Sequence, residues 1–294
     1  MATHLDTVPE PTVVLPEEQV ADEAPLTVIE ARSGWQLIDL GELWRYRELL
    51  FFLAWRDVKV RYKQTVLGAA WAVLQPLATM IVFSVVLGRV ASTPDAAVPY
   101  PLFVFAGLLP WLFFAGAMSA AGQSVVGNQN LITKVYFPRL IIPVSAIGAS
   151  GVDFLIAFVM LLTLMLGYSV MPGWGLLAVP VLMLGLTVAA VGIGTLLCAL
   201  TVAYRDFRHV IPFLVQLWMF ATPGIYLQSG TSGPARWWLL LNPAEGFITN
   251  FRAAVLGGPY DWLALGAAVS ISIGFVVAGC LYFRRVERNF ADII

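Results

Sequence analysis

The sequence contains few charged residues. Asp, Glu, Lys and Arg together make up 12% of its 294 residues, whereas a soluble domain carries about a quarter. Hydrophobic residues make up 59% of the chain, and the mean hydropathy is +0.81. This balance excludes an ordinary soluble domain and predicts an integral membrane protein.

The residues that most often carry chemistry are also scarce. None of the three lysines follows a glycine, so the Gly-Lys-Ser/Thr motif that binds nucleotide phosphates is absent. The two histidines, His4 and His209, lie far apart in the sequence, which disfavours a metal site. Cys198 and Cys280 lie in apolar runs and are interpreted as small hydrophobic side chains rather than a disulfide. No paired carboxylates or nucleophile elbow occurs at an expected membrane face, so we expect neither an enzyme nor a cofactor bound by this chain.

The N-terminal segment differs in character from the rest. Its first 31 residues hold seven acidic groups and no Lys or Arg. Without a basic n-region and an apolar h-region it does not read as a signal peptide, and its polar, Pro-containing composition is typical of disorder. We therefore expect a disordered acidic cytoplasmic tail at 1–33, an amphipathic interfacial helix region at 34–66, a six-span transmembrane domain at 67–283 and a cytoplasmic C-terminal tail at 284–294.

Six apolar stretches approach the ~20 residues that a helix needs to cross the hydrocarbon core. The fifth is interrupted by Pro212 and by Pro223-Gly224. The region 228–259 is too polar to span again and too apolar for an ordinary loop, so we expect short re-entrant or interfacial helices on the outer side. The predicted fold class is an all-α integral membrane protein with six transmembrane helices. The spans are placed at about 67–88, 101–125, 140–167, 175–201, 211–227 and 261–283.

The distribution of Lys and Arg predicts the orientation. With both termini in the cytoplasm, fourteen of the seventeen basic residues fall on the cytoplasmic side. Only Arg89, Arg236 and Arg252 remain outside. The positive-inside rule therefore favours this orientation, and an even number of spans agrees with it.

A basic, aromatic helix is predicted just before the first span. At about 100° per residue, the aromatic and apolar residues Trp44, Phe51, Trp55, Val58 and Tyr62 fall on one side of it. Such a helix lies in the membrane interface, with rings among acyl chains and cations at phosphates. The alternative is the basic flank that any first span has on its cytoplasmic side. The candidate interfacial residues are Trp44, Arg45, Trp55, Arg56, Lys59 and Lys63.

Asp153 is the one clear ionisable group within the predicted spans. An acid at this depth suggests a functional role such as a proton relay. The alternative, favoured here, is that it pairs with hydroxyls or a backbone group of a neighbouring helix and fixes packing. Glycines in the spans are interpreted as close contacts between helices; they are Gly148, Gly151, Gly185, Gly192 and Gly194.

The segment NQNLITKVYFPR, residues 128–139, joins the second and third spans on the cytoplasmic side. It mixes aromatic and aliphatic groups with basic ones and ends at Pro138 before the next helix. Exposed apolar groups on a short polar loop indicate a docking surface for another protein. The alternative is an interfacial turn lying on lipid headgroups.

Four blocks of sequence then point to a family. The runs WRDVKVRYKQTVLGAAWAVLQP, NQNLITKVYFPR, DFRHVIPFLVQLWMFATPGIY and NPAEGFITNFRAAVLGG occur in this order. Together they resemble the membrane subunit of ABC-type polysaccharide exporters, a group that includes O-antigen, capsule and teichoic acid export permeases. The resemblance runs from about residue 40 to the C-terminus, and the acidic tail lies outside it.

The resemblance implies a homodimer in the bacterial inner membrane that works with two copies of a separate ABC ATPase, where ATP and Mg would bind. Its substrate would be a glycan on an isoprenoid-pyrophosphate lipid, carried to the outer side, and no nucleic-acid partner is expected. By the same resemblance the loop between spans two and three couples to the ATPase, through Asn128, Leu131, Lys134, Tyr136, Phe137 and Arg139. Spans one and five line the glycan conduit, near Trp71, Gln75, Phe83, Gln216, Trp218 and Tyr226.

Two classes of function remain open from the sequence. The first is the membrane subunit of an ATP-driven exporter. The second is a secondary transporter or lipid flippase driven by protons through Asp153. A sugar offers C–H faces and hydroxyls but little charge, so aromatic planes and neutral polar groups fit the first class better.

Overall fold

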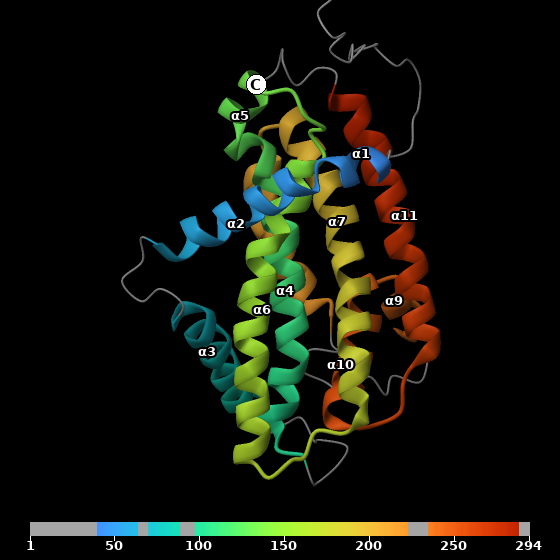
Figure 1. Ribbon diagram of the computed structural model, residues 1–294. Coiled ribbons are helices and arrows are strands. Elements are labelled where there is room, and N and C mark those ends of the chain that lie inside the picture. The colour runs from blue at the N-terminus through green and yellow to red at the C-terminus, as the bar shows by residue number, and fades with distance from the viewer. Residues whose placement is uncertain (1–39, 64–69, 89–97, 223–234, 288–294) are drawn as a thin grey trace, which may run out of the picture. The chain divides into compact units, whose positions relative to one another are not determined.

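The computed structural model describes residues 40–63, 70–88, 98–222 and 235–287, which belong to one compact unit (Figure 1). Every regular element in these ranges is a helix. Among the described residues, five helices are long and apolar enough to cross a membrane. They are α3 (Ala70–Leu87), α4 (Tyr100–Gly127), α6 (Ile141–Gly167), the combined η1 (Trp174–Ala178) and α7 (Val179–Ala203), and α11 (Trp262–Glu287). The all-helical, multi-pass fold is thus confirmed, with these five spans close to their predicted positions.

The fifth predicted span coincides with a shorter apolar helix, α8 (Phe207–Phe220). It begins four residues before the predicted start and carries Pro212 inside its first turns. Pro212 is the sixth residue of the helix, beyond the four N–H groups that have no partner within it, so its ring removes the hydrogen bond that an N–H at this position would donate to the Arg208 carbonyl. The remainder of the predicted span, 223–227, lies outside the described residues.

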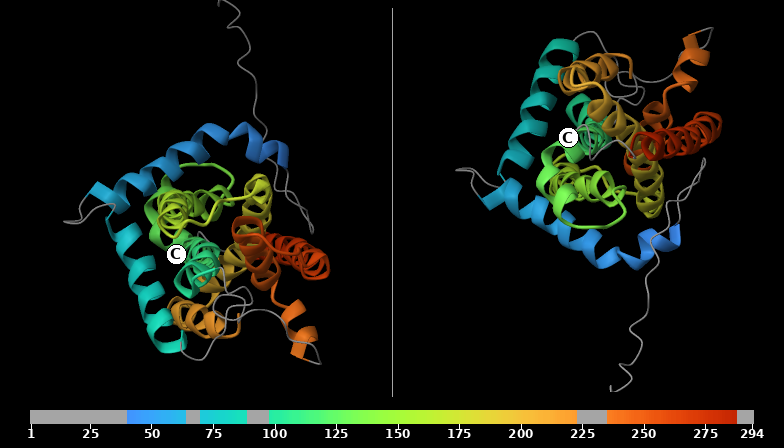
Figure 2. Two further views of the ribbon diagram at one scale, coloured as in Figure 1. Left: turned by 90° about the horizontal axis from the view of Figure 1, so that it is seen from below. Right: turned by 90° about the horizontal axis from the view of Figure 1, so that it is seen from above.

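Helix α4 forms the centre of the bundle (Figure 2). It is predominantly buried and contributes the fully buried side chains of Phe105, Trp111 and Phe114 to the main hydrophobic core. Its neighbours include α6, α7, α3, α8 and α10 (Pro243–Leu256). By contrast, α3 leaves apolar side chains such as Val82 and Val85 exposed. Such an apolar surface is suited to contact with lipid acyl chains or with another protein.

Glycines bring several helices into close contact, as small residues do in membranes. A Cβ added at Gly192 of α7 would lie 2.5 Å from the backbone nitrogen of Val276 on α11. Likewise, one at Gly194 would meet Ala121 of α4, and one at Gly148 would meet Ala54. Gly185 packs against Phe247. The prediction was wrong for Gly151, because nothing lies within 4 Å of the position its Cβ would take.

Short helices precede the last span, as predicted for 228–259. They are α9 (Ala235–Leu240) and the buried α10. Asn242 caps α10 by accepting a hydrogen bond from the Ala244 backbone N–H at 3.1 Å. Asn250 of α10 exchanges hydrogen bonds with the backbone of Asp261, where α11 begins. These side chains hold α10 against the bundle at the end away from α5 (Gln129–Lys134), as Figure 1 shows.

Candidate functional site: a cavity and a docking segment

The predicted interfacial helix consists of two helices, α1 (Leu40–Arg45) and α2 (Arg47–Lys63), separated by a turn at Tyr46. Helix α2 runs along the side of the bundle and packs on α6, with Leu53 buried and Ala54 beside Gly148 (Figure 2). The residues of the predicted aromatic and apolar stripe differ in exposure. Of its aromatic and apolar residues, Trp44, Phe51 and Trp55 are exposed, and Val58 and Tyr62 are half-buried.

Cations of α1 and α2 lie near these rings and near the next loop. Arg45, Lys59 and Lys63 are exposed, and the Lys59 ammonium lies 5.5 Å from the Trp55 ring centroid. Arg56 is ion-paired with Asp57 at 2.8 Å. It also donates to the side-chain oxygen of Asn128 at 2.7 Å. Arg56 therefore joins α2 directly to the junction between α4 and α5.

The predicted docking segment contains α5 and the extended residues after it. Lys134 and Tyr136 are exposed, Tyr136 to 72%. Leu131 is half-buried and packs against a second hydrophobic cluster. Phe137 is only 5% exposed and belongs to that cluster. Phe137 therefore packs into this cluster and anchors the segment to the bundle. The prediction that its ring is exposed for docking is wrong.

The second hydrophobic cluster joins the helices at the end of the bundle where residues 128–139 lie. It includes Leu53 of α2, Val125 of α4, Phe137, Cys198 of α7 and Phe283 of α11. Arg139 closes the same end by donating to the Glu287 carbonyl oxygen at 2.5 Å. Both cysteines are buried and free, as the sequence predicted. Residues 128–139, the predicted docking segment, thus pack on side chains from α2, α4, α7 and α11.

Asp153 of α6 accepts hydrogen bonds from Arg61 and Tyr62, two neighbouring residues near the end of α2. The contact with Arg61 is also an ion pair. Desolvation, reinforced by the hydrogen bond to Asp153, raises the pKa of Tyr62 to about 12, so its phenol stays protonated at neutral pH. The Tyr62 hydroxyl agrees with the expectation that Asp153 pairs with a hydroxyl or a backbone group of a neighbouring helix. Arg61 was not predicted as a partner, although its position just before the first span was a signal for it.

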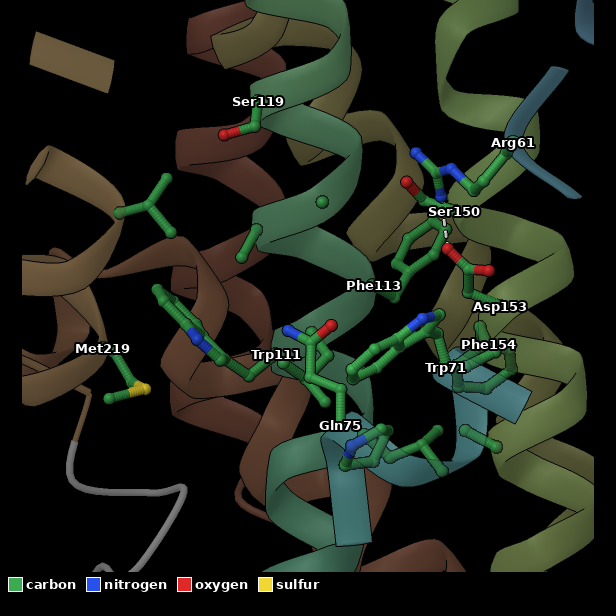
Figure 3. A pocket seen from close by; sticks show the side chains of 18 of the residues that line it. Arg61, Trp71, Gln75, Trp111, Phe113, Ser119, Ser150, Asp153, Phe154 and Met219 are labelled. Carbon is green, nitrogen blue, oxygen red and sulfur yellow. Dashed lines mark hydrogen bonds and ion pairs between the residues drawn. The ribbon is translucent and has the colours of Figure 1, made fainter. Parts of the chain in front are cut away.

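A half-open cavity of about 650 Å³ lies beside this ion pair, between residues of α2, α3, α4, α6 and α8. Trp71, Gln75 and Gln216, predicted from the family resemblance, all line it. Figure 3 shows the Trp71 ring and the Gln75 amide side by side, with Asp153 and Phe154 nearby. Further aromatic and hydroxyl groups come from Trp111, Phe113, Ser119 and Ser150.

Of the other three predicted conduit residues, the two that the structure describes, Phe83 and Trp218, do not line the cavity. Tyr226 lies outside the described residues. Trp218 instead donates its Nε1–H to Asn242 at 2.9 Å and packs edge-on against Phe114. Asn242 also donates to Thr222 at 2.8 Å. Trp218 therefore ties α8 to the start of α10.

Arg252 is a buried cation that the sequence analysis placed in an outer segment without a role. Its guanidinium lies 3.9 Å from the Phe103 ring centroid, in the geometry of a cation–π contact. Burial lowers the pKa of Arg252 to about 10, and the charge of Glu245 opposes that shift. Arg252 therefore remains protonated at neutral pH and holds α10 against α4. Within the described ranges, no group of three or more His, Cys, Asp or Glu side chains is arranged to hold a metal ion.

Comparison with known proteins places this arrangement in context. A family model described as ABC-2 type transporter matches residues 48–256. The O-antigen export system permease protein RfbA of Myxococcus xanthus is 31% identical over 260 residues, covering 86% of this chain and 98% of that protein. A protein of the same name from Klebsiella pneumoniae is 25% identical, covering 84% of this chain and 95% of its own length. The polysialic acid transport protein KpsM of Escherichia coli is 24% identical, covering 87% and 98%.

Proposed function

Because this chain belongs to the ABC-2 type transporter family, we propose that it carries a lipid-linked polysaccharide, such as an O-antigen-like glycan, out of the cytoplasm. It is the membrane permease subunit, and ATP hydrolysis belongs to a partner ATPase. The proposed assembly is a homodimer of this chain with two ATPase copies, in which ATP and Mg bind to the partner. The substrate is a glycan on an isoprenoid-pyrophosphate carrier.

One observation carries the choice of substrate class. The match to permeases named for O-antigen export extends over 84–86% of this chain and 95–98% of those proteins. The family match at residues 48–256 contains the described helices from α3 to α10 and all of α2 except its first residue. A relative named for polysialic acid transport matches over a similar extent. These names refer to O-antigen export and to polysialic acid transport, which supports a polysaccharide as the substrate class proposed for this chain.

The proposed docking surface for the ATPase is the exposed part of residues 128–139. Lys134 and Tyr136 present a cation and a ring on a segment whose other side is anchored by Phe137. Exposed aromatic residues beside charges are typical anchors of protein interfaces. The hydrogen bond from Arg56 to Asn128 connects this surface to α2.

The proposed conduit begins with the cavity between α3, α4, α6 and α8. Trp71 offers an aromatic face, and Gln75 and Gln216 offer neutral donors and acceptors. These groups suit a substrate with C–H faces and many hydroxyls. Helix α2, with Trp44, Trp55 and the exposed cations, is proposed to lie in the interface of the bacterial inner membrane.

We propose that both termini are cytoplasmic. The basic connections at α5, at the start of α8 and at the end of α11 then lie on the inner side. Impermeant thiol reagents would test this in a variant without Cys198 and Cys280. A cysteine at Met171, exposed beyond α6, should react in intact cells, and one at Thr133, exposed on α5, should react only after permeabilisation. The opposite pattern would reverse the orientation and remove the proposed docking surface.

The function itself is tested by deletion and reconstitution. Removal of the gene should leave the lipid-linked glycan inside the cell and deplete it from the surface. The purified chain should show no ATPase activity alone, and activity should appear with its partner. Normal surface glycan in the deletion strain would refute the proposal.

The docking surface is tested by Tyr136→Asp, which removes an apolar contact and adds a charge at an exposed position. The ATPase should no longer co-purify, although the permease stays folded. Tyr168→Asp is the matched control, since Tyr168 is also exposed but follows the far end of α6. Retention of the ATPase by folded Tyr136→Asp protein would rule out this surface.

Proton coupling through Asp153 is the competing function. No observation favours it, since Asp153 is held by an ion pair and by a phenol hydrogen bond between α2 and α6. A transmembrane proton gradient applied to vesicles without ATP should drive no export. Export under that gradient alone would favour the competing function.

A further inference from the structure

The cavity beside α3 has one feature that a smooth, neutral conduit does not need. An ion-paired carboxylate, that of Asp153, lies in its wall near the exposed ring of Trp71 (Figure 3). We propose that this cavity is a saccharide-binding site in which Asp153 accepts hydrogen bonds from the hydroxyls of a neutral sugar lying against Trp71. This inference rests on the proposed function and gives Asp153 a role in reading the substrate.

The carboxylate has acceptor capacity left for a ligand. Its Oδ2 accepts from Arg61 and its Oδ1 from Tyr62. Each carboxylate oxygen has two lone-pair sites, so each retains one for a further donor. The Asp153 side chain is 34% exposed and lines the cavity, so that remaining capacity is accessible there. Two neighbouring sugar hydroxyls are the donors that such a pair of oxygens accepts.

Arg61 and Tyr62 fix the direction of that carboxylate. Both come from α2, whereas Asp153 belongs to α6, so the orientation of the acceptor depends on the packing of two helices. A charge-assisted hydrogen bond is strong only when its geometry is held in advance. The ion pair leaves the cluster without a net charge, which suits a neutral sugar and disfavours an acidic one placed against the carboxylate.

Trp71 supplies the second half of the site. Its side chain is 54% exposed and its indole lies at the cavity, where a flat ring can cover the C–H face of a pyranose. Gln75, one helical turn later, and Gln216 of α8 add amides that both donate and accept. The volume of about 650 Å³ falls within the ~300–1,000 Å³ typical of small-molecule sites.

A purely structural role for the ion pair predicts a different outcome from the one proposed here. If Arg61 and Asp153 only fasten α2 to α6, exchanging the two residues should preserve both the ion pair and export. If the carboxylate binds sugar, the exchange puts a guanidinium in its place and removes the acceptors. The exchange Arg61→Asp with Asp153→Arg therefore separates the two roles.

The test is made in cells that produce the natural glycan, with the permease assembled with its ATPase. Folding is monitored by the melting temperature and by co-purification of the ATPase. The exchanged variant should melt near the wild type but export roughly tenfold less glycan or worse, the scale for loss of a charged hydrogen bond. A stable exchanged variant that exports normally would overturn the inference. The proposed function would still stand if gene deletion abolished export.

A second measurement applies whether or not the exchanged variant folds. A photoreactive benzophenone amino acid replaces Met219 of α8, which lines the cavity, or Leu217, an exposed residue of the same helix that does not. In exporting cells, irradiation should attach the glycan to position 219 and not to position 217. Absence of glycan at position 219, or equal attachment at both positions, would overturn the inference.

Discussion

The contact between α7 and α11 can be tested by comparing Gly192 with Gly151, because only Gly192 lies close to the backbone of another helix. Both are glycines within long apolar helices. A Cβ at Gly192 would lie 2.5 Å from the Val276 nitrogen, 2.8 Å from the Phe275 carbonyl carbon and 3.0 Å from the Val276 Cα. These are backbone atoms, so the two helices must move apart. At Gly151 the same Cβ would meet nothing within 4 Å.

This comparison gives the expected difference in stability between the two alanine variants. Replacing a helical glycine with alanine gains about 1 kcal/mol of helix propensity, and that gain is common to both variants. The difference between them is therefore the overpacking cost at Gly192, about 1–3 kcal/mol. For a chain of this size, Gly192→Ala should melt roughly 2–12 °C below Gly151→Ala.

Thermal unfolding in detergent measures this difference directly. Cys198 and Cys280 are buried and free, so a dye that fluoresces on reaction with thiols reports the transition. Gly192→Leu should lower the melting temperature further, because a larger side chain pushes against the same backbone. Equal melting temperatures for Gly192→Ala and Gly151→Ala would refute the close approach of α7 and α11 at this position.

Three further predictions concern stability. Trp218→Phe keeps the ring against Phe114 but loses the hydrogen bond to Asn242, so unfolding should become easier by about 0.5–1.5 kcal/mol in a denaturant series; an unchanged midpoint would contradict that bond. Arg236→Ala removes an exposed ion pair with Asp261 and should change the free energy of unfolding by less than about 1 kcal/mol. Asp261→Ala also removes the hydrogen bond that caps the Ala264 N–H, so it should lower the free energy of unfolding by about 1 kcal/mol more. Equal effects of the two variants would show that the cap is unimportant. The pKa of Tyr62 is raised from 10.0 to about 12, so the stability that its protonated phenol contributes is fully present below pH 10 and is lost as the pH rises through 12. The melting temperature of Tyr62→Phe should therefore fall less over that range than that of the wild type. Equal falls in melting temperature would show that Tyr62 is not the cause.

The sequence alone determined the class of the molecule and the course of its main helices. Apolar runs of membrane-spanning length have few alternative structures, because a lipid-exposed backbone must satisfy its own hydrogen bonds. The long helices therefore lie close to the predicted spans, and the short helices before α11 were recognised from the break in hydropathy. The ordered blocks of sequence likewise pointed to the family that the comparisons establish.

Only the tertiary structure decided which side of each helix faces its neighbours. Tyr136 and Phe137 are adjacent aromatic residues, yet one is exposed and the other is buried under α5. Gly151 and Gly192 look equivalent in sequence, yet only Gly192 meets another backbone. Asp153 appeared isolated within a span, yet α2 brings Arg61 and Tyr62 to it across about ninety residues. Such pairings depend on the rotation and contact of helices distant in sequence, and in a uniformly apolar span the hydrophobic periodicity that would reveal this rotation is nearly absent.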